Sequence, residues 1–330
     1  MGKHKTAGKS DREGISMVEL FNRFPDDATA EAWFVSRRWP EGIHCPHCGS
    51  CNVQTGAKHK TMPYRCREKE CGKRFSTKTG TVMEASKLGF QVWAIATYLL
   101  STSLKSVSSM KLHRDLNINQ RSAWFLAHRL REALSDREGP FEGPLEADEA
   151  YFGGKRANMS NAKRKELADT GRGAVGKTAV VGVKDRATNR VAASVVPSTT
   201  GEILQGFVRA HAEEGAMIYT DEASAYAGLA KSHGHEAVNH GASEYVRGMA
   251  HTNGMESFWS MLKRADKGTF HKMSPKHLDR YVQEFAGKHN VRDMDTIDIM
   301  TAFVTGAVGK RLRYRELIAD NGLPSGARSA

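Results

Sequence analysis

The amino-acid sequence predicts an α/β protein that carries two smaller modules ahead of its main domain. Three observations lead to this prediction. All five cysteines lie within 27 residues near the N-terminus, helical periodicity runs from residue 88 to residue 134, and β-branched runs begin only after residue 140. Because each pattern favours a different kind of element, we divide the chain where the pattern changes.

These changes of pattern set five expected segments. They are an N-terminal segment with a short helix at 1–40, a cysteine-rich ribbon at 41–80, a helical module at 81–135, an α/β domain at 140–295, and a C-terminal helix and tail at 296–330. Residues 27–39 have the apolar spacing of a short amphipathic helix. The expected linker, residues 135–144, is rich in glycine and proline.

The charge of the chain favours a polyanionic partner. Lysine and arginine outnumber aspartate and glutamate by 49 to 37, so the formal net charge is +12. Nucleic acid is the most common partner of such a protein. No window reaches the roughly 18 apolar residues that a membrane helix needs, and the polar N-terminus lacks the apolar core of a secretion signal. We therefore expect a cytoplasmic protein without a membrane partner.

The cysteines predict a structural zinc site. Cys45 and Cys48 form one short pair, Cys66 and Cys71 form a second, and 17 residues separate the pairs. Zinc prefers four soft ligands in a tetrahedron, and two knuckles of this spacing supply them. Four thiolates leave no open position, so the metal would stabilise the ribbon rather than catalyse a reaction. Cys51 is the surplus thiol, although it could replace Cys48 in a second register.

The ribbon also carries a basic rim. Residues 58–78 contain eight lysines and arginines against two glutamates. A rigid ribbon with such a rim fits phosphate contacts, although a plain solvated surface would have the same composition. Three neighbouring histidines are weaker candidates for zinc ligands, namely His44, His47 and His59.

Three short helical segments between residues 88 and 134 fit a helix-turn-helix module. The third segment carries the polar residues Asn119, Gln120, Arg121, His128, Arg129 and Arg131. Asparagine, glutamine and arginine read base edges in the major groove, so we expect Arg121 and Arg129 to contact DNA. The alternative is a purely structural module, because many three-helix packings bind nothing.

The remaining segment alternates strands and helices. It has a strand at 145–154, two β-branched runs at 179–186 and 190–197, a helix at 201–214, a strand at 216–221, and helices at 222–232, 253–265, 274–290 and near 296–318. Residues 171–178, GRGAVGKT, match a phosphate-loop pattern. Polar residues precede them and strand-like residues follow, so we expect no nucleotide cofactor. A basic loop that includes Lys177 and lies against DNA is the preferred interpretation.

Three carboxylates stand on separate elements of this segment. Asp148 lies inside the first strand, Asp221 ends a later strand, and Glu256 lies on a helix that it shares with Lys263. Two-metal phosphoryl transfer needs carboxylates that converge from separate elements. The order of these elements matches the RNase H-like fold of polynucleotidyl transferases. We therefore expect an RNase H-like integrase catalytic core that holds magnesium at these three residues.

Each carboxylate also has an ordinary structural interpretation. The first could be an edge residue, with Glu146 or Glu149 as the ligand instead. Asp221 could simply cap the helix that follows it. The third, Glu256, stands three residues after Asn253, and these two could form a capping box.

Together these residues resemble the insertion-sequence transposases that have an N-terminal zinc ribbon and a DDE-type integrase domain, the ISXO2-like transposases. The matching stretches are CPHCGS, YRCREKECGKRFSTKTGT, EADEAYFGGK, GRGAVGKTAVVGV, YTDEASAY, and HTNGMESFWSMLKR followed by GTFHKMSPKHLDRYVQEFAGKHN. They run from about residue 25 to residue 292. The resemblance implies that Asp148 and Asp221 are catalytic, with Glu256 as the third residue and Asn253 and His251 as its rivals.

The resemblance also implies an activity and its partners. It implies strand cleavage at the terminal inverted repeats of a mobile element, followed by strand transfer, with two Mg²⁺ or Mn²⁺ ions at the three carboxylates. Lys263 and Arg264 would contact phosphate near the cut. The partners would be double-stranded DNA, as transposon ends and target, and further copies of this chain in a homodimer or larger homo-oligomer on the bacterial nucleoid. Two alternatives are an RNase H-like nuclease without strand transfer and a zinc-ribbon DNA-binding protein with a decayed catalytic domain.

Overall fold

The structure is a computed structural model that describes residues 12–135, 139–154, 159, 161–166, 176–221, 224–238 and 251–325. The chain divides into two compact units, and each is described by itself. The first unit comprises the residues up to Ser135 together with Val291–Ala319. The second comprises the residues that follow as far as Asn290, together with the segment from Asp320 onward. The predicted C-terminal helix thus packs in the N-terminal unit.

A small antiparallel sheet forms the ribbon of the first unit. Its three strands are β1 (Val53–Gln54), β2 (Tyr64–Cys66) and β3 (Arg74–Phe75), in that order. Trp39, directly after helix α2 (Asp27–Arg38), packs edge-on against Tyr64 at 5.8 Å and Phe75 at 6.1 Å between ring centroids. These aromatic rings give the ribbon a small core beside its cysteines.

Helices form the rest of the first unit. They are α1 (Met17–Arg23), α2 (Asp27–Arg38), α3 (Phe90–Thr102), α4 (Ser109–Asp115), α5 (Gln120–Leu134), α10 (Thr296–Gly306) and α11 (Tyr314–Ile318). At the start of several helices, the side chain of the N-cap residue accepts a hydrogen bond from a free backbone N–H of the first turn. Ser16 and Glu19 form a capping box for α1, and Asn119 accepts from Ser122 N at 2.7 Å at the start of α5.

Helix α10 belongs to the same core as α3 and α5. Phe303 and Met300 are buried with Trp93 in one apolar cluster. At Gly306 a Cβ atom would come within 2.4 Å of the carbonyl oxygen of Ala133, so only glycine permits this approach to α5. The first unit is therefore completed by residues that follow the α/β domain in the sequence.

A five-stranded mixed sheet forms the centre of the second unit. Its strands are β4 (Leu145–Phe152), β5 (Thr178–Asp185), β6 (Val191–Val196), β7 (Met217–Asp221) and β8 (Gly234–Val238), arranged in the order β6-β5-β4-β7-β8. Strands β4, β5 and β6 are antiparallel neighbours, whereas β7 runs parallel to β4 and to β8. This mixed sheet fits the predicted RNase H-like core.

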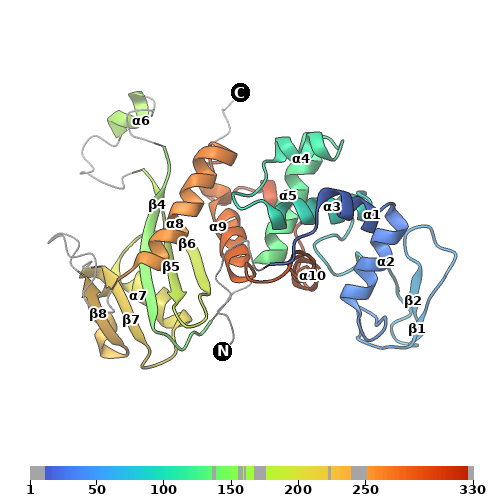
Figure 1. Ribbon diagram of the computed structural model, residues 1–330, viewed down its shortest axis with the longest axis horizontal. Helices are drawn as coiled ribbons and strands as arrows, with labels where there is room; N and C mark the ends of the chain where they lie inside the picture. The colour runs from blue at the N-terminus through green and yellow to red at the C-terminus, as the bar shows by residue number, and fades with distance from the viewer. Residues whose placement is uncertain are drawn as a thin grey trace. The chain divides into compact units, whose positions relative to one another are not determined.

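Helices cover both faces of this sheet (Figure 1). One face packs on α7 (Gly201–His211) and the 3₁₀ helix η2 (Ser224–Lys231). The other face packs on α8 (Asn253–Ala265) and α9 (Pro275–Asn290), which the π-helical turn η4 (Asp266–Phe270) separates. The short helix α6 (Asn161–Glu166) precedes β5 in the sequence. Alternate residues of β4 therefore point toward different helical layers.

The predicted elements of both units form close to their predicted bounds, with three differences. Residues 222–232 were expected to be an α-helix, and the described part of them forms η2, a 3₁₀ helix. The helix expected near 296–318 is divided into α10 and α11 by residues 307–313, where Gly309 has φ +76°. Helices α1 and α6 and strand β8 were not predicted. Within the described ranges, no helix is both long enough and apolar enough to cross a membrane.

Candidate functional site

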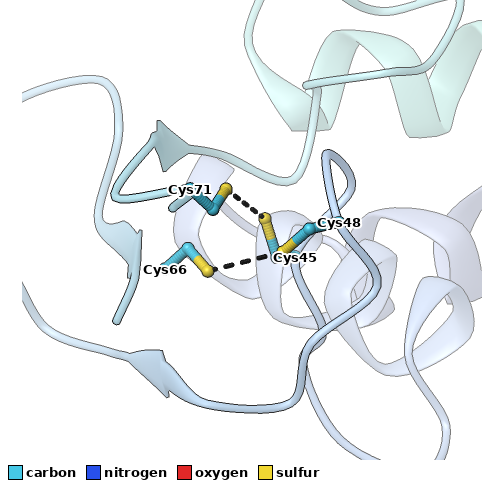
Figure 2. Close-up of side chains that lie close together, drawn as sticks. All are labelled: Cys45, Cys48, Cys66 and Cys71. Atoms are coloured by element: carbon cyan, nitrogen blue, oxygen red, sulfur yellow. Dashed lines mark hydrogen bonds between the residues drawn. The ribbon is translucent and has the colours of Figure 1, made fainter. Parts of the chain in front are cut away.

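The four predicted zinc ligands lie together in the ribbon (Figure 2). Cys45 and Cys71 are 3.8 Å apart and Cys48 and Cys66 are 3.6 Å apart, measured between sulfur atoms. All four sulfur atoms lie within 4.8 Å of one another. A tetrahedral zinc ion with bonds of about 2.3 Å to sulfur separates its ligands by about 3.8 Å. The cluster could therefore hold a zinc ion.

Two tight turns place these sulfur atoms. Gly49 follows the first cysteine pair with φ +78°, and Gly72 follows the second with φ +55°. Only glycine adopts this left-handed backbone without strain, so each turn can fold back on its own cysteines. Cys51 is exposed and lies outside the cluster. The second register, in which Cys51 would replace Cys48, is not formed.

The basic rim of the ribbon is exposed except at its last residue. Seven of the eight cationic side chains are exposed, namely Lys58, Lys60, Arg65, Arg67, Lys69, Lys73 and Arg74. Lys78 instead donates to the carbonyl of Leu88 at 2.6 Å and lies over the Phe90 ring at 4.5 Å. A groove of about 1020 Å³ lies beside the ribbon, lined by basic residues and by Asp27, Glu31 and Glu84.

Asp148 and Asp221 lie on neighbouring parallel strands. Leu145 of β4 is opposite Ile218 of β7 and Glu146 is opposite Tyr219, so each aspartate follows the last paired residue of its strand by two positions. Neighbouring strands are about 4.8 Å apart, and opposite residues of a parallel pair point to the same face. The Asp148 carboxylate faces α8, whose Trp259 donates to it, and the charge of Asp221 acts on Asp148.

Burial and two neighbouring carboxylates raise the pKa of Asp148. Burial is the largest cause, the negative charges of Glu149 and Asp221 add to it, and together they raise the pKa to about 7. The N–H groups of Glu149 and Trp259, which donate to the two oxygens of Asp148 at 2.8 and 3.1 Å, oppose this rise. The remaining negative charge is what a bound divalent cation would relieve.

Helix α8 approaches the sheet closely at this point. Gly182 of β5 pairs with Asp148, and a Cβ atom there would lie 2.5 Å from Met255 Cε and 3.0 Å from the Trp259 ring. A larger residue would require the Met255 methyl group or the Trp259 ring to shift. Glu256 follows Met255 on this helix and is exposed. Outside the cysteine cluster, the described residues contain no set of three potential metal ligands within 4.8 Å, so Glu256 is not brought that close to both aspartates.

Glu146 has a different role from the one considered for it as a metal ligand. Its carboxylate is 3% exposed, accepts from Arg186 Nε at 2.9 Å, and accepts from the backbone N–H of Met255 at 2.9 Å. Arg186 in turn lies over the Tyr219 ring at 4.3 Å and within 3.0 Å of His251 Nδ1. The pair therefore joins β4 to the first turn of α8, which has no side-chain cap of its own.

The capping-box interpretation of Glu256 is wrong. The N-cap of α8 is Thr252, Asn253 is already the first helical residue, and no side chain forms a cap hydrogen bond. Glu256 is joined to the cap by its backbone N–H, which donates to the Thr252 carbonyl at 3.0 Å. Glu149 faces the opposite layer, where the hydroxyl of Tyr226 donates to it at 2.9 Å.

The predicted DNA-binding cations occupy unequal positions. Arg121, Lys177, Lys263 and Arg264 are exposed. Arg129 is buried instead, and its guanidinium donates to the carbonyls of Leu312 and Glu84. Arg129 therefore holds two backbone segments in place and is not exposed, as the predicted DNA contact would require. On a helix packed from both sides, sequence pattern alone did not separate buried from exposed arginines.

Part of the phosphate-loop match lies outside the described residues, namely 171–175. Its last residue, Thr178, begins strand β5, so a strand follows the glycines as expected. Two site residues were not predicted at all: Arg186 and Gly182. For Arg186 the available signal was a charged residue directly after a buried strand.

The sequence of the second unit is similar to those of known proteins. Residues 140–290 match the family described as ISXO2-like transposase domain. A protein of Halobacterium salinarum, described as an uncharacterized protein in transposable element ISH50, is 29% identical over 241 residues, which cover 69% of this chain and 79% of that protein. No solved structure gives a significant match. The α/β unit of this chain is therefore similar to the ISXO2-like transposases.

Proposed function

We propose that this protein is a DNA transposase that cuts the ends of a mobile element and joins them to target DNA. The observation that carries the proposal is the pair Asp148 and Asp221. The two stand on neighbouring parallel strands, the charge of Asp221 contributes to the raised pKa of Asp148, and Asp148 accepts from Trp259 of α8, the helix that also carries Glu256. The family match of the same unit supports transposition as the setting of this chemistry.

The carboxylates fit a pair of hard divalent ions. Asp148 uses each oxygen to accept one N–H, and a carboxylate oxygen has a second lone pair left for a metal. Bound Mg²⁺ or Mn²⁺ would polarise the scissile phosphate and favour deprotonation of the attacking hydroxyl. Trp259 holds the carboxylate of Asp148 in one orientation, so little reorganisation is needed when the DNA binds.

The reaction that we propose proceeds in two balanced steps. Water attacks a phosphorus atom at the end of the element, the P–O bond to the element's 3′ oxygen breaks, and that oxygen leaves as a 3′-OH. This 3′-OH then loses its proton and attacks a phosphorus atom of target DNA. A P–O bond to the element forms, the P–O bond to the target's own 3′ oxygen breaks, and that oxygen takes up a proton and leaves as a 3′-OH. Neither step needs a covalent bond to the protein.

The first unit would supply DNA recognition. The exposed polar residues of α5, Gln120 and Arg121, lie at its N-terminal end, where a helix-turn-helix protein reads bases. The exposed ribbon cations would contact phosphates. In the second unit, Lys177, Lys263 and Arg264 would hold the strands near the carboxylates. Joining two ends would require at least two copies of the chain, acting in the cytoplasm on nucleoid DNA.

A strand-transfer assay tests this proposal. Full-length protein is incubated with Mg²⁺, a pre-cut terminal repeat and a target duplex, and both cleavage and joining are measured. Joined product should form with the wild type and be lost with Asp148→Asn and with Asp221→Asn. Cleavage without joining would favour the nuclease alternative, whereas DNA binding without either reaction would favour the decayed transposase.

The third ligand is tested in the same assay. Glu256→Gln removes the charge and keeps the size of the side chain, and it should abolish joining. Asn253→Ala changes an exposed neighbour on the same helix and should leave joining largely intact. His251→Ala is assayed beside them, and if the Asn253 or the His251 variant is the inactive one, that residue replaces Glu256 in the site.

A further inference from the structure

The chain returns to the first unit with a strongly basic segment. Residues 310–315 read KRLRYR and contain four cations and no acidic residue. Helix α11 begins at the end of this segment, with Arg313 as its N-cap. The segment follows α10 and belongs to the unit that holds α4 and α5.

Buried contacts fix the segment to α5. Leu312 is 3% exposed, and its carbonyl accepts from the buried Arg129 at 3.3 Å. The Lys310 ammonium donates to the carbonyls of Ala133 and Ser135, at 3.3 and 3.1 Å, and so satisfies the C-terminal end of α5. The segment is therefore held in one place on α5.

The three arginines of the segment face solvent. The side chains of Arg311 and Arg313 are 46% and 44% exposed, and Arg315 is also exposed. Arg311 pairs with Glu84 at 3.0 Å and Arg313 with Glu316 at 3.5 Å. Ion pairs this exposed contribute little stability, so they would exchange readily for a phosphate.

Tyr314 joins these arginines to the first turn of α5. Its hydroxyl accepts from Arg121 Nε at 2.8 Å, and the Arg121 guanidinium lies over its ring at 4.4 Å. The ring also packs edge-on against Phe125 at 5.4 Å between centroids. Arg121, Arg311, Arg313 and Arg315 are all exposed and lie on α5 or on the segment fixed to it, with Glu84 and Glu316 beside two of them. We call these four arginines the return patch.

We infer that the return patch binds the sugar-phosphate backbone of double-stranded DNA beside the groove that α5 enters. This inference rests on the proposed DNA binding and names a surface that the helical module alone does not contain. Arginine matches phosphate because its planar fork donates two parallel hydrogen bonds. In DNA-binding proteins such backbone contacts set the orientation of the reading helix, and here Tyr314 would hold Arg121 in that orientation.

Salt dependence of DNA binding tests the inference. Binding of the full-length protein to a labelled 40-base-pair duplex of arbitrary sequence is measured by fluorescence anisotropy over a series of KCl concentrations. Each lost phosphate contact lowers the slope of log K against log salt by about 0.9. Arg313→Gln with Arg315→Gln should therefore lower the slope by about 1.8, and the matching Arg→Lys double variant should restore most of it.

Matched substitutions control for net charge. Arg23→Gln with Lys231→Gln removes two exposed cations from other helices and should leave the slope unchanged. Tyr314→Phe keeps the ring and removes the hydroxyl, so binding should weaken by roughly two- to tenfold while the slope stays constant. If the Arg313 and Arg315 variant binds as the wild type does, the inference is overturned and the proposed DNA binding stands. Wild-type protein that binds without salt dependence would overturn both.

Discussion

Removal of the Arg186 cation should destabilise the second unit strongly. Arg186 and Glu146 form a pair with side chains only 12% and 3% exposed. In Arg186→Met the volume is largely kept, but the Glu146 carboxylate stays buried between β4 and α8 without the guanidinium, with the His251 imidazole 3.4 Å away. Breaking one partner of such a pair costs about 3–5 kcal/mol. Since whole domains are stable by only about 5–15 kcal/mol, this is a large fraction.

The loss of stability in Arg186→Met should begin at one place in the second unit. Glu146 accepts the N–H of Met255, so α8 should loosen at its first turn before the rest of the sheet opens. Urea unfolding followed by hydrogen exchange and mass spectrometry measures both the global change and the protection of residues 253–265. The ribbon and α3 should keep their protection.

A double substitution checks the electrostatic origin of the effect. Glu146→Leu in the Arg186→Met background removes the unpaired charge, so most of the stability should return, and about 1–3 kcal/mol should remain lost because the N–H of Met255 lacks an acceptor. The reasoning is refuted if Arg186→Met alone costs less than about 1 kcal/mol, or if the double variant is no more stable than the single one.

Three further predictions follow from the two sites. The pKa of Asp148 is raised to about 7, so folding stability should fall as pH rises from about 4 to 7. Asp148→Asn should flatten this dependence and stabilise the magnesium-free, zinc-loaded protein at pH 8 by up to about 4 kcal/mol. The melting temperature of both proteins, measured against pH, checks this. Cys66→Ser should abolish binding of one zinc ion per chain in elemental analysis and unfold the ribbon, whereas Cys51→Ser should keep it; equal losses would contradict the four-cysteine site. Gly182→Ala should displace α8 and cost about 1–3 kcal/mol in urea unfolding, with altered Trp259 fluorescence; an unchanged protein would mean that Met255 simply moves aside.

The cysteine cluster and the strands around the aspartates could be predicted from the sequence because their signals are local. Paired cysteines on short turns need no distant partner, and the run LEADEAYF alternates between two buried faces. The element order then sufficed to expect a sheet of the observed kind. The same local reasoning located α2, α5 and α8 closely.

Tertiary contacts determined what the sequence could not show. Arg129 and Arg121 stand eight residues apart on one helix, yet one is buried by Leu312 and the other exposed, because a segment from the far end of the chain packs there. The sequence allowed Glu146 as an alternative metal ligand, because its ion pair with Arg186, 40 residues away, is visible only in the structure. The capping-box pattern at Asn253 and Glu256 failed because α8 begins one residue earlier than that box requires.

The central claim is that Asp148 and Asp221 hold the catalytic metal ions, and a change of ligand softness tests it most directly. A cysteine thiolate binds Mg²⁺ poorly and softer metals better. In the strand-transfer assay, Asp221→Cys should be inactive with Mg²⁺ and recover activity with Mn²⁺, whereas Asp221→Ala should stay inactive with both. An Asp221→Cys protein that responds to the two metals as the wild type does would contradict the claim.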